Sequence, residues 1–407
     1  MNNPIPYGRH NITEEDIEAV VSTLKSDYLT QGPKIAEFEE GFAAYVNSKF
    51  AVAVSNGTAA LHLSAIALNI QPGNKVITTP ITFAATANCV RYCGGEVVFA
   101  DIDPDTYLLD IKKVRKLLEE SPKGTYKGII PVDFAGTAVN LEAFRKLANE
   151  YDLWIIEDSC HAPGGYFMDS DAKQQHCGNG NFADLAIFSF HPVKHIACGE
   201  GGMITTNDEK LYEKLLMLRT HGITKNVEGF KNSIEFAVGS IFNSSEADVM
   251  SSGDETYPNW YMEMQELGYN YRLTDLQAAL GNSQLKRAKD GIKKRRILAA
   301  RYMEAFKNKD YIIGQSGIIE GHAYHLYILE VKDRFGLYKY LRENNIFSQI
   351  HYIPCHLMPY YKNLGWKEGD FPNAENFYKK CISLPMFPTL TEEEQLWVIK
   401  KIHDYYI

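Results

Sequence analysis

The chain has 407 residues, of which 45% are hydrophobic and 23% charged, so it is long enough for two domains and a large core. Its formal net charge of −9 argues against a broad surface for nucleic acids or anionic membranes, because such surfaces depend on clustered Lys and Arg. The sequence shows neither the roughly 20 consecutive apolar residues that span a bilayer nor a basic start followed by an apolar run, so we expect no membrane insertion and no export.

Two helices are predicted near the N-terminus, after a short arm. Thr13 offers a capping hydroxyl, and Glu14, Glu15 and Asp16 form an acidic first turn ahead of apolar residues at helical spacing. This pattern is typical of a helix start. A second helix is expected to begin near Pro33.

From about residue 50, short runs rich in β-branched residues alternate with helical patterns. Such alternation predicts an α/β fold in which a mostly parallel sheet is covered by helices. The seven expected strands are Ala51–Val54, Lys75–Thr79, Glu96–Ala100, Gly128–Pro131, Leu153–Ile156, Asp184–Phe188 and Gly202–Thr205.

The segment Ser233–Trp260 interrupts this alternation, because it is rich in Ser, Asn, Glu and Asp, and we expect it to form a long surface loop. Beyond Leu273 a long helical pattern follows, and we place a domain boundary inside it, near residue 285. Residues 1–285 would form an N-terminal arm and a large domain, and residues 286–407 a smaller C-terminal α/β domain. The expected elements of the smaller domain are His322–Val331, Phe347–Ile350 and a last helix near Glu392–His403.

The seven cysteines are odd in number, scattered along the chain and without any C-x-x-C pair. A small secreted domain held by disulfides would instead show a dense cysteine framework. The pattern therefore favours reduced thiols and a cytoplasmic protein.

Two polar motifs directly follow predicted strands in the middle of the chain. Glu157-Asp158-Ser159-Cys160-His161 comes after Leu153–Ile156, and Ser189-Phe190-His191-Pro192-Val193-Lys194 comes after Asp184–Phe188. A carboxylate at the end of one strand can keep a pyridine nitrogen protonated, and a lysine beyond a second strand can form a Schiff base with an aldehyde on the same ring. Together the motifs predict a site for pyridoxal 5′-phosphate (PLP).

Asp158 and Lys194 are the two residues that we assign to catalysis. Asp158 ends a buried run, where an unpaired carboxylate is costly and a pyridinium N–H is a suitable partner. Lys194, partly removed from water and near the positive charge of the cofactor, would lose its proton more readily, and nucleophilic attack requires that loss.

The phosphate of such a cofactor has a predicted cradle at Gly57 and Thr58, where a strand turns into a helix. Backbone amides and the Thr58 hydroxyl would point at an anion, which a helix N-terminus favours, although Thr58 as an ordinary helix cap is the alternative. Ser189 offers a second hydroxyl. Phe83 would stack on the ring unless it is a core residue, and His161 would meet the ring hydroxyl unless it is simply a loop histidine.

Five motifs follow one another along nearly the whole chain: Gly57-Thr58-Ala59-Ala60-Leu61, Glu157-Asp158 with His161, Ser189-Phe190-x-x-x-Lys194, Gly199-Glu200-Gly201-Gly202 and Gly268-Tyr269-Asn270-Tyr271-Arg272. In this order they resemble the DegT/DnrJ/EryC1/StrS family of sugar aminotransferases. The resemblance implies the fold-type I architecture of PLP-dependent transferases, a homodimer, and transfer of an amino group, usually from glutamate, to a keto sugar attached to a nucleotide.

Carried over residue by residue, the resemblance implies that Lys194 forms the Schiff base with PLP and that Asp158 pairs with the pyridine nitrogen. Phe83 would cover the ring, and His161 would lie near its phenolic oxygen. The residues implied to hold the phosphate are Gly57, Thr58, Ser189 and, from the other subunit, Asn270. One branch of the family, which makes deoxy sugars by dehydration, has His in place of the lysine, so Lys194 argues against that branch.

Within the family, the chain is most similar to the pseudaminic acid branch, which aminates C4 of UDP-4-keto-6-deoxy-N-acetyl-β-L-altrosamine. The likeness rests on Ile5–Arg9, Ser26–Pro33, Ser189–Lys194 and His351–His356. The implied reaction is ping-pong. L-Glutamate leaves its amino group on the cofactor as pyridoxamine 5′-phosphate and departs as 2-oxoglutarate, and the keto sugar then takes the amino group.

A uridine nucleotide-sugar needs aromatic faces and cations near the cofactor. The candidates for these contacts are Tyr7, Arg9, Tyr28, Arg272 and His351, each of which is equally plausible as a surface or interface residue. The sequence leaves open the configuration of the sugar, the choice between C3 and C4, and the amino donor.

Other functions fit parts of the sequence. A dinucleotide-dependent oxidoreductase would share the alternating elements, but neither Gly178-Asn179-Gly180 nor Gly199–Gly202 makes the G-x-G-x-x-G turn between a first strand and helix. A non-catalytic ligand sensor with the same fold is opposed by the complete set of Asp158, Ser189 and Lys194. We assign no metal. His351 and His356 are separated by Pro354 and are expected in a loop, and His322 and His325 would lie on opposite faces of a strand.

Overall fold

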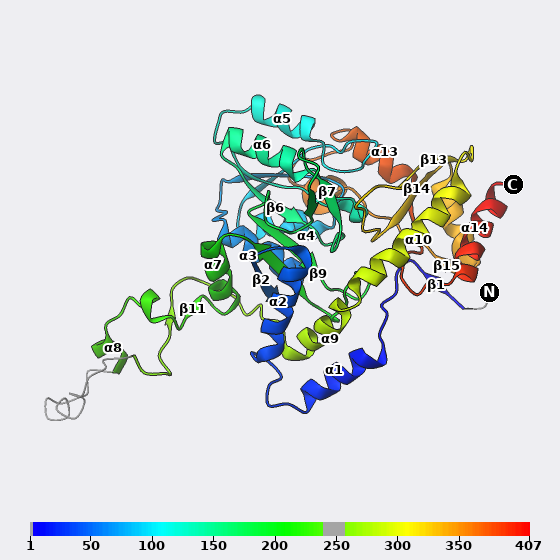
Figure 1. Ribbon diagram of the computed structural model, residues 1–407. Coiled ribbons are helices and arrows are strands. Elements are labelled where there is room, and N and C mark those ends of the chain that lie inside the picture. The colour runs from blue at the N-terminus through cyan, green and yellow to red at the C-terminus, as the bar shows by residue number, and fades with distance from the viewer. Residues whose placement is uncertain (1–2, 239–256) are drawn as a thin grey trace, which may run out of the picture.

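The computed structural model describes residues 3–238 and 257–407. Its centre is a seven-stranded sheet in the order β2-β10-β9-β6-β5-β3-β4 (Figure 1). The strands are β2 Phe50–Val54, β3 Lys75–Thr78, β4 Glu96–Phe99, β5 Tyr126–Ile130, β6 Trp154–Asp158, β9 Leu185–Ser189 and β10 Gly202–Thr206. Strand β10 runs antiparallel to both of its neighbours, and the other adjacent pairs are parallel.

All seven predicted strands are confirmed, with bounds that differ by at most two residues. One difference concerns the site, because Asp158 and Ser189 are the last residues of β6 and β9, whereas the sequence predicts that both lie beyond the strand ends. Their backbones are therefore fixed by the sheet ladder, which places their side chains more tightly than a loop would.

Helices cover both faces of the sheet. Successive residues of one strand bury their side chains on opposite faces, so that Ile155 packs in one apolar cluster and Ile156 in another. The cluster containing Ile156 includes residues of α3, α4 and α7, whereas that of Ile155 includes residues of α5 and α6. The bounds of these helices are α3 Gly57–Ala67, α4 Ala84–Tyr92, α5 Ile111–Glu119, α6 Leu141–Tyr151 and α7 Glu209–Arg219.

The two N-terminal helices begin where the sequence predicts, as α1 Glu14–Leu24 and α2 Pro33–Val46. Asp16 closes the first turn of α1 by accepting the Thr13 backbone N–H at 2.9 Å. The same carboxylate is buried and accepts hydrogen bonds from Arg287, which ties α1 to the chain near the predicted domain boundary.

The expected single helix beyond Leu273 is in fact two helices, α9 Asp275–Leu285 and α10 Ala288–Phe306. The predicted boundary near residue 285 falls between them, and the division into two domains stays a prediction. A second apolar core forms beyond this point around an antiparallel sheet, β13-β14-β16. Its elements are β13 Ile312–Gln315, β14 Tyr327–Val331, α11 Arg334–Glu343, β15 Ile346–Phe347, β16 Cys381–Leu384 and α14 Glu392–Tyr406. The helices α12 Pro359–Lys362 and α13 Pro372–Lys380 follow β15 in the chain, but their buried Tyr361, Ala374 and Phe377 pack in the same cluster as Ile156.

Three details of the C-terminal portion differ from the sequence prediction. The element expected at Phe347–Ile350 corresponds to β15, which ends at Phe347. The sequence predicts a strand over His322–Val331, but β14 begins only at Tyr327, so residues 322–326 lie outside the strand. The N-terminal arm also belongs to this portion, because β1 Ile5–Pro6 pairs in parallel with β15 and Ile5 is buried in the second core. Both chain ends therefore lie on the same side in Figure 1.

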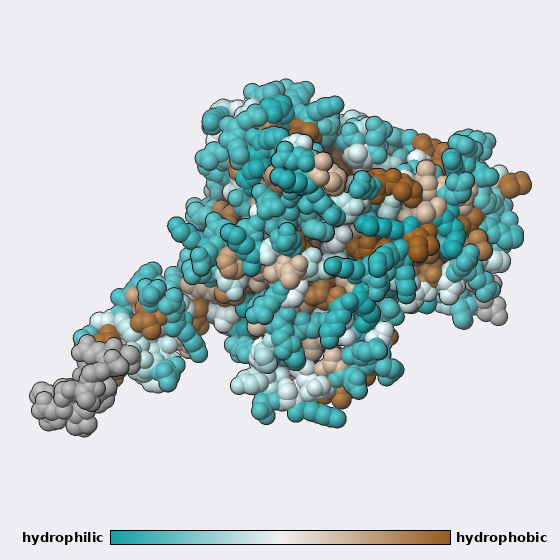
Figure 2. Space-filling model, in the orientation of Figure 1, coloured by the Kyte–Doolittle hydropathy of each residue, from teal (hydrophilic) through white to brown (hydrophobic). Residues whose placement is uncertain are grey.

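A segment between α7 and α9 extends away from the body (Figure 1). It contains β11 Ile223–Thr224, which pairs with β12 Glu263–Met264, and the short helix α8 Ile234–Val238. The predicted loop Ser233–Trp260 is thus helical at its start, and its residues 239–256 lie outside the described residues. Figure 2 shows the described part standing clear of the remaining surface with apolar side chains exposed. Phe236 and Trp260 are exposed residues of this segment.

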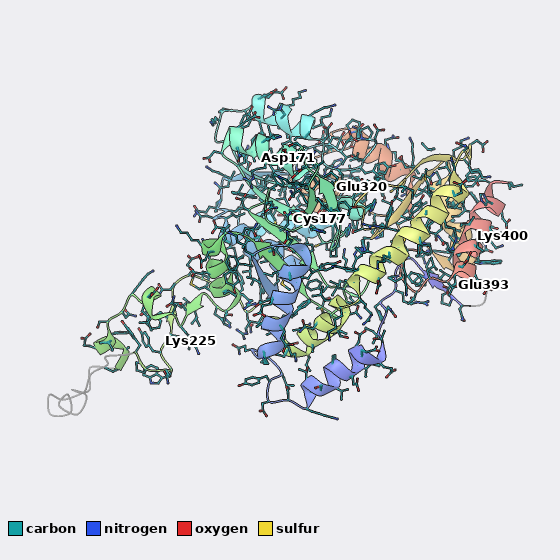
Figure 3. The ribbon with its side chains drawn as sticks, in the orientation of Figure 1. Asp171, Cys177, Lys225, Glu320, Glu393 and Lys400 are labelled. Atoms are coloured by element: carbon teal, nitrogen blue, oxygen red, sulfur yellow. The ribbon has the colours of Figure 1, made fainter. Side chains whose placement is uncertain are left out.

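Strands β7 Tyr166–Met168 and β8 Gln174–His176 form a hairpin. Charged side chains such as Asp171 and Lys400 lie at the outside in Figure 3, whereas Cys177 lies inside. Among the helices of residues 3–238 and 257–407, none has the length and apolar character that crossing a bilayer requires.

Candidate active site

A cavity of about 820 Å³ lies at the carboxyl ends of strands β2, β3, β6 and β9. This edge of an α/β sheet is where ligands bind in such folds. Nine of the predicted site residues line the cavity: Tyr7, Gly57, Thr58, Phe83, Asp158, His161, Ser189, Lys194 and His351. Residues 349–353, which follow β15, close the cavity from the C-terminal portion.

Asp158 is 4% exposed and keeps its carboxylate at the cavity wall. Its Oδ2 accepts the Thr86 hydroxyl at 2.7 Å and its Oδ1 accepts the Cys160 backbone N–H at 3.2 Å. Among the described residues, no lysine, arginine or histidine forms an ion pair with it. A buried carboxylate that faces a cavity without a cationic partner suits a ligand that carries a positive N–H.

Lys194 reaches the same cavity from the turn after β9, where its backbone N–H donates to the His191 carbonyl at 2.8 Å. Removal from water lowers the pKa of its ammonium, and the nearby Arg295 guanidinium lowers it further, against the opposing effects of Cys160 and Asp158. A lower pKa increases the fraction of free amine at neutral pH, which is the form that attacks a carbonyl carbon.

The N-terminus of α3 forms an anion cradle. Its cap is Asn56, whose side chain accepts the Ala59 N–H at 2.8 Å, so the helix is N-capped as the alternative expects, but by Asn56 rather than by Thr58. The Gly57 and Thr58 N–H groups lie in the first turn, where helical donors have no intrahelical acceptor. A Cβ on Gly57 would lie 3.0 Å from Cβ of Ser189, so a glycine here lets the helix end approach the Ser189 hydroxyl.

Phe83 is 62% exposed although it belongs to an otherwise well-packed region, because its ring faces the cavity. The alternative that it is a core residue is therefore wrong. Its ring centre lies 6.3 Å from that of Tyr352 on the C-terminal side. The two rings provide an apolar wall against which a flat ligand can stack.

His161 is 4% exposed and contacts Tyr352, so it is not a solvated loop histidine. Its Nδ1 lies 3.3 Å from the Ala135 backbone N–H, which can only donate, and burial lowers the pKa of the ring well below its usual value. The neutral ring therefore carries its proton on Nε2 and donates it to the Tyr352 hydroxyl oxygen at 3.1 Å. This arrangement leaves the Tyr352 O–H free to donate into the cavity.

Four predicted site residues are not brought to the cavity of this chain. Arg9 stacks over the Phe387 ring at 5.3 Å and donates to the Pro4 carbonyl, and Tyr28 is on the surface. Asn270 forms an isolated bridge with Thr220, and Arg272 forms one with Val54. Asn270 was assigned to the site of the other subunit, and that role stays a prediction.

Sequence reasoning missed several residues of the cavity. Tyr352 lies in the segment His351–His356 and Thr86 lies three residues after Phe83, but nothing in the sequence indicates that they contact His161 and Asp158. His325 was weighed only as a metal ligand, yet it lines the cavity and its ring centre lies 4.3 Å from that of His161. These contacts join residues that are 72 to 191 positions apart in the chain.

The residues at this edge fit PLP in three independent respects. Asp158 provides an acceptor for a pyridinium N–H, Lys194 an amine of lowered pKa, and the α3 N-terminus with Ser189 an anion cradle that a Cβ at Gly57 would crowd. Phe83 supplies the wall for the ring. The chemical set corresponds to the pyridine nitrogen, the aldehyde, the phosphate and the ring face of that cofactor.

Comparison with known proteins agrees with this fit. The sequence profile of the DegT/DnrJ/EryC1/StrS aminotransferase family matches residues 10–403. The spore coat polysaccharide biosynthesis protein SpsC of Bacillus subtilis is 38% identical over 99% of this chain and 97% of its own length. The UDP-4-amino-4,6-dideoxy-N-acetyl-β-L-altrosamine transaminase of Campylobacter jejuni is 34% identical over 94% of this chain and 92% of its own.

Solved structures give the same picture. PseC of Helicobacter pylori, an aminotransferase in pseudaminic acid biosynthesis, superposes with a TM-score of 0.84 at 29% identity and covers 99% of both chains. The pyridoxamine phosphate form of a sugar aminotransferase from Streptococcus pneumoniae superposes with a TM-score of 0.85 at 28% identity and covers 98% of both chains.

Proposed function

The chain belongs to the DegT/DnrJ/EryC1/StrS aminotransferase family, and we propose that it transfers the amino group of L-glutamate to C4 of UDP-4-keto-6-deoxy-N-acetyl-β-L-altrosamine. That it is a PLP-dependent sugar aminotransferase with the fold-type I architecture follows from the family. The similarity to the Campylobacter transaminase and to PseC supports the particular sugar and pseudaminic acid-type biosynthesis. Its action in the cytoplasm is part of the same proposal.

The single observation that carries the catalytic assignment is that Lys194 and Asp158 meet in one cavity with the α3 anion cradle. When bound, the cofactor supplies an electron sink and a carrier for the amino group. Asp158 would pair with the pyridine nitrogen, and Lys194 would hold the aldehyde carbon. Gly57, Thr58 and Ser189 would bind the phosphate, with Phe83 against the ring.

Lys194 would also move the proton in each half-reaction. Once an incoming amine has displaced it, its Nζ is a free base in a partly buried position, because removal from water lowers its pKa. Nζ of Lys194 would then serve as the base that takes a proton from the α-carbon of glutamate and as the acid that gives it to the C4′ carbon of the cofactor. Tyr352, oriented by His161, is placed to donate a hydrogen bond to an oxygen in the cavity.

A second copy of the chain would complete the site. Among the described residues that line the cavity, Lys194 is the only lysine or arginine, yet a nucleotide diphosphate and the two carboxylates of glutamate each favour cationic partners. We propose a homodimer in which Asn270 joins the phosphate site of the other subunit. Arg272, on the same segment and outside this chain's cavity, is a candidate cation for that site.

Another nucleotide-linked 3- or 4-keto sugar is the second candidate substrate. It is favoured by the identity to SpsC, which exceeds that to the Campylobacter transaminase. A non-catalytic sensor is a weaker alternative, because Lys194, Asp158 and Ser189 all face the same cavity.

The experiment uses the purified protein reconstituted with PLP. L-Glutamate is added first, and the release of 2-oxoglutarate is measured; the UDP-4-keto sugar is added next, and its product is identified by mass spectrometry and NMR. A 4-amino sugar formed in proportion to the 2-oxoglutarate released supports the proposal. If 2-oxoglutarate is released and another keto sugar is aminated but this sugar is not, the other sugar is the substrate. If no 2-oxoglutarate is released, glutamate is not the amino donor.

A further inference from the structure

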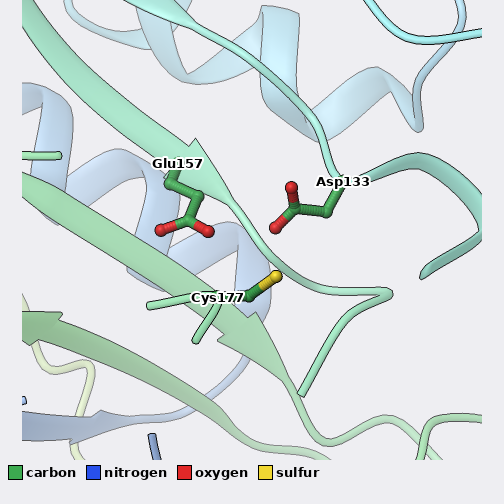
Figure 4. Close-up of side chains that lie close together, drawn as sticks. All are labelled: Asp133, Glu157 and Cys177. Carbon is green, nitrogen blue, oxygen red and sulfur yellow. The ribbon is translucent and has the colours of Figure 1, made fainter. Parts of the chain in front are cut away.

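A second group of titratable side chains lies directly behind Asp158. The carboxyl groups of Asp133 and Glu157 and the thiol of Cys177 lie within 4.8 Å of one another, turned toward each other as Figure 4 shows. All three are buried. Glu157 precedes Asp158 on β6, so its side chain leaves the opposite face of the strand from the one that Asp158 presents to the cavity.

Three hydrogen bonds to defined partners hold the two carboxyl groups. Oδ1 of Asp133 accepts the Val139 N–H at 2.8 Å, and its Oδ2 accepts the Ser159 hydroxyl at 2.5 Å. Oε2 of Glu157 accepts the Gly178 N–H at 2.9 Å. Each donor comes from a different stretch of chain, so the pair connects the turn after β6 to two neighbouring segments.

The charge on this pair follows from its surroundings. Burial raises the pKa of both carboxyl groups, and that of Glu157 lies well above its usual range. Repulsion by Asp133 raises the pKa of Glu157 further. The hydrogen bonds from Ser159 and Val139 instead favour the ionised form of Asp133. The other titratable group that faces them is Cys177, whose pKa burial raises, so it stays a neutral thiol. These directions favour the proton on Glu157 and the negative charge on Asp133.

Asp133 also fixes the backbone of Asp158. The Asp133 N–H donates to the Asp158 carbonyl at 3.0 Å, and the Asp158 N–H donates to the Pro131 carbonyl at 2.9 Å. The Asp133 side chain meanwhile holds Ser159, the next residue. A change in the charge or orientation of Asp133 is thus transmitted through two contacts to the residue that faces the cavity.

We propose that Glu157 is a positioning residue for Asp158: as a neutral acid it shares its proton with Asp133 and keeps the turn from Asp158 to His161 in place. This inference rests on the proposed function, because it assigns Asp158 to the cofactor. Ionisation of Glu157 would place a second negative charge in a buried site with no cation, which would drive the two carboxyls apart and release Ser159. A metal bound by the same three groups is the competing explanation, but three of the carboxyl oxygens already accept hydrogen bonds.

The test compares Glu157→Gln with Glu157→Leu in the full-length protein. Glutamine reproduces the shape and the donor of a neutral acid, whereas leucine removes both contacts. Infrared spectra of the cofactor-free and PLP-loaded proteins are recorded for the carbonyl stretch of a buried protonated carboxylic acid, and PLP dissociation constants are measured by fluorescence titration. Ser159→Ala, which keeps the pair but removes its link to the turn, is the second variant.

We expect the acid band in the natural protein and its loss in Glu157→Gln, with nearly unchanged PLP affinity. Glu157→Leu should weaken PLP binding by about tenfold, since it leaves a buried partner unsatisfied, and Ser159→Ala should weaken it less. Absence of the band, equal losses for glutamine and leucine, or a stoichiometric metal that Glu157→Gln removes would each overturn the inference. Failure of the natural protein to bind PLP would instead refute the proposed function, and the infrared result would still decide the protonation of Glu157.

Discussion

The Thr86 hydroxyl donates a 2.7 Å hydrogen bond to Oδ2 of Asp158 and so joins the first helical turns of α4 to the end of β6. Thr82 is the next residue in this series of hydrogen bonds, because its hydroxyl oxygen lies 2.7 Å from that of Thr86. Because Asp158 can only accept when ionised, Thr86 must donate to it and in turn accepts from Thr82. The carboxylate is thereby held at a fixed angle to the cavity.

Thr86→Val should reduce activity by about tenfold with little change in the melting temperature of the cofactor-loaded protein. The substitution keeps the shape but removes one charge-assisted hydrogen bond from Asp158, which is worth about 1.5 to 3 kcal/mol. The measurement is kcat/KM for glutamate beside PLP affinity. Thr82→Val is the control, with a smaller loss because it acts through Thr86; equal losses for both would contradict the relay.

Lys194→Ala should abolish multiple turnovers while still allowing pyridoxamine 5′-phosphate to bind. The variant loses both the covalent anchor and the group that moves the proton, but it keeps Asp158 and the α3 cradle. Intact mass after borohydride reduction should show the PLP adduct in the natural protein and none in the variant. Lys293→Ala removes an exposed lysine from α10 and should keep both the adduct and the activity; sustained turnover by Lys194→Ala would exclude Lys194 from its role.

Phe83→Ala should weaken PLP binding without destabilising the fold, because the Phe83 ring is exposed to the cavity rather than packed in a core. Phe144, which is 4% exposed in the cluster beneath α6, provides the contrast. Phe144→Ala should cost about 3 to 5 kcal/mol of unfolding free energy. Urea unfolding of the two variants, with PLP titration of each, separates the roles; a comparable loss of stability in both would show that Phe83 is structural.

Acid should destabilise the folded chain through its buried histidines. Burial lowers the pKa of His322 and His351 to about 3, whereas a histidine of the unfolded chain titrates at about 6.5. Between these two pH values the unfolded chain binds more protons than the folded chain does. The unfolding free energy that the neutral histidines contribute is therefore fully present above about pH 6.5 and is lost as the pH falls toward about 3. Each contributes a slope of up to about 1.4 kcal/mol per pH unit.

Urea unfolding at several pH values checks this slope. His322→Gln should reduce it by about one proton, whereas His10→Gln, which removes an exposed histidine, should leave it unchanged. An unfolding free energy that is constant from neutral pH to about pH 5 would contradict the burial-based assignment.

Local patterns predicted much of this molecule because they depend on neighbouring residues. The strands were found from alternation, and the polar motifs at the ends of two of those strands indicated Asp158 and Lys194. The break between α9 and α10 was missed because Leu285-Lys286-Arg287-Ala288 contains neither glycine nor proline. Tyr352 was missed as the partner of His161 because packing alone brings it there from the C-terminal portion.

The substrate candidates show the same limit. Arg9 has the charge that a nucleotide needs, but its guanidinium is engaged by the Phe387 ring far along the chain. Tyr7, two residues earlier, reaches the cavity. The sequence identifies chemically suitable side chains, whereas the direction of each side chain depends on the tertiary contacts that surround it.

A mixing experiment tests whether Asn270 serves the site of the other subunit. Lys194→Ala and Asn270→Asp are each expected to be nearly inactive, the second because a carboxylate would repel the phosphate. In a mixed dimer, the site that contains the natural Lys194 would receive the natural Asn270 from its partner, so one site of the two is intact. Random reassembly of equal amounts should therefore restore about a quarter of the natural activity.

The opposite arrangement predicts a different result. If Asn270 acted in the site of its own chain, each site of the mixed dimer would carry one of the two substitutions, and mixing would restore nothing. Lys194→Ala mixed with Lys194→Arg is the control, because neither arrangement produces an intact site. Asn270 forms a backbone bridge with Thr220 at the surface of its own chain, so the substitution leaves that bridge intact and the comparison reports on the phosphate site.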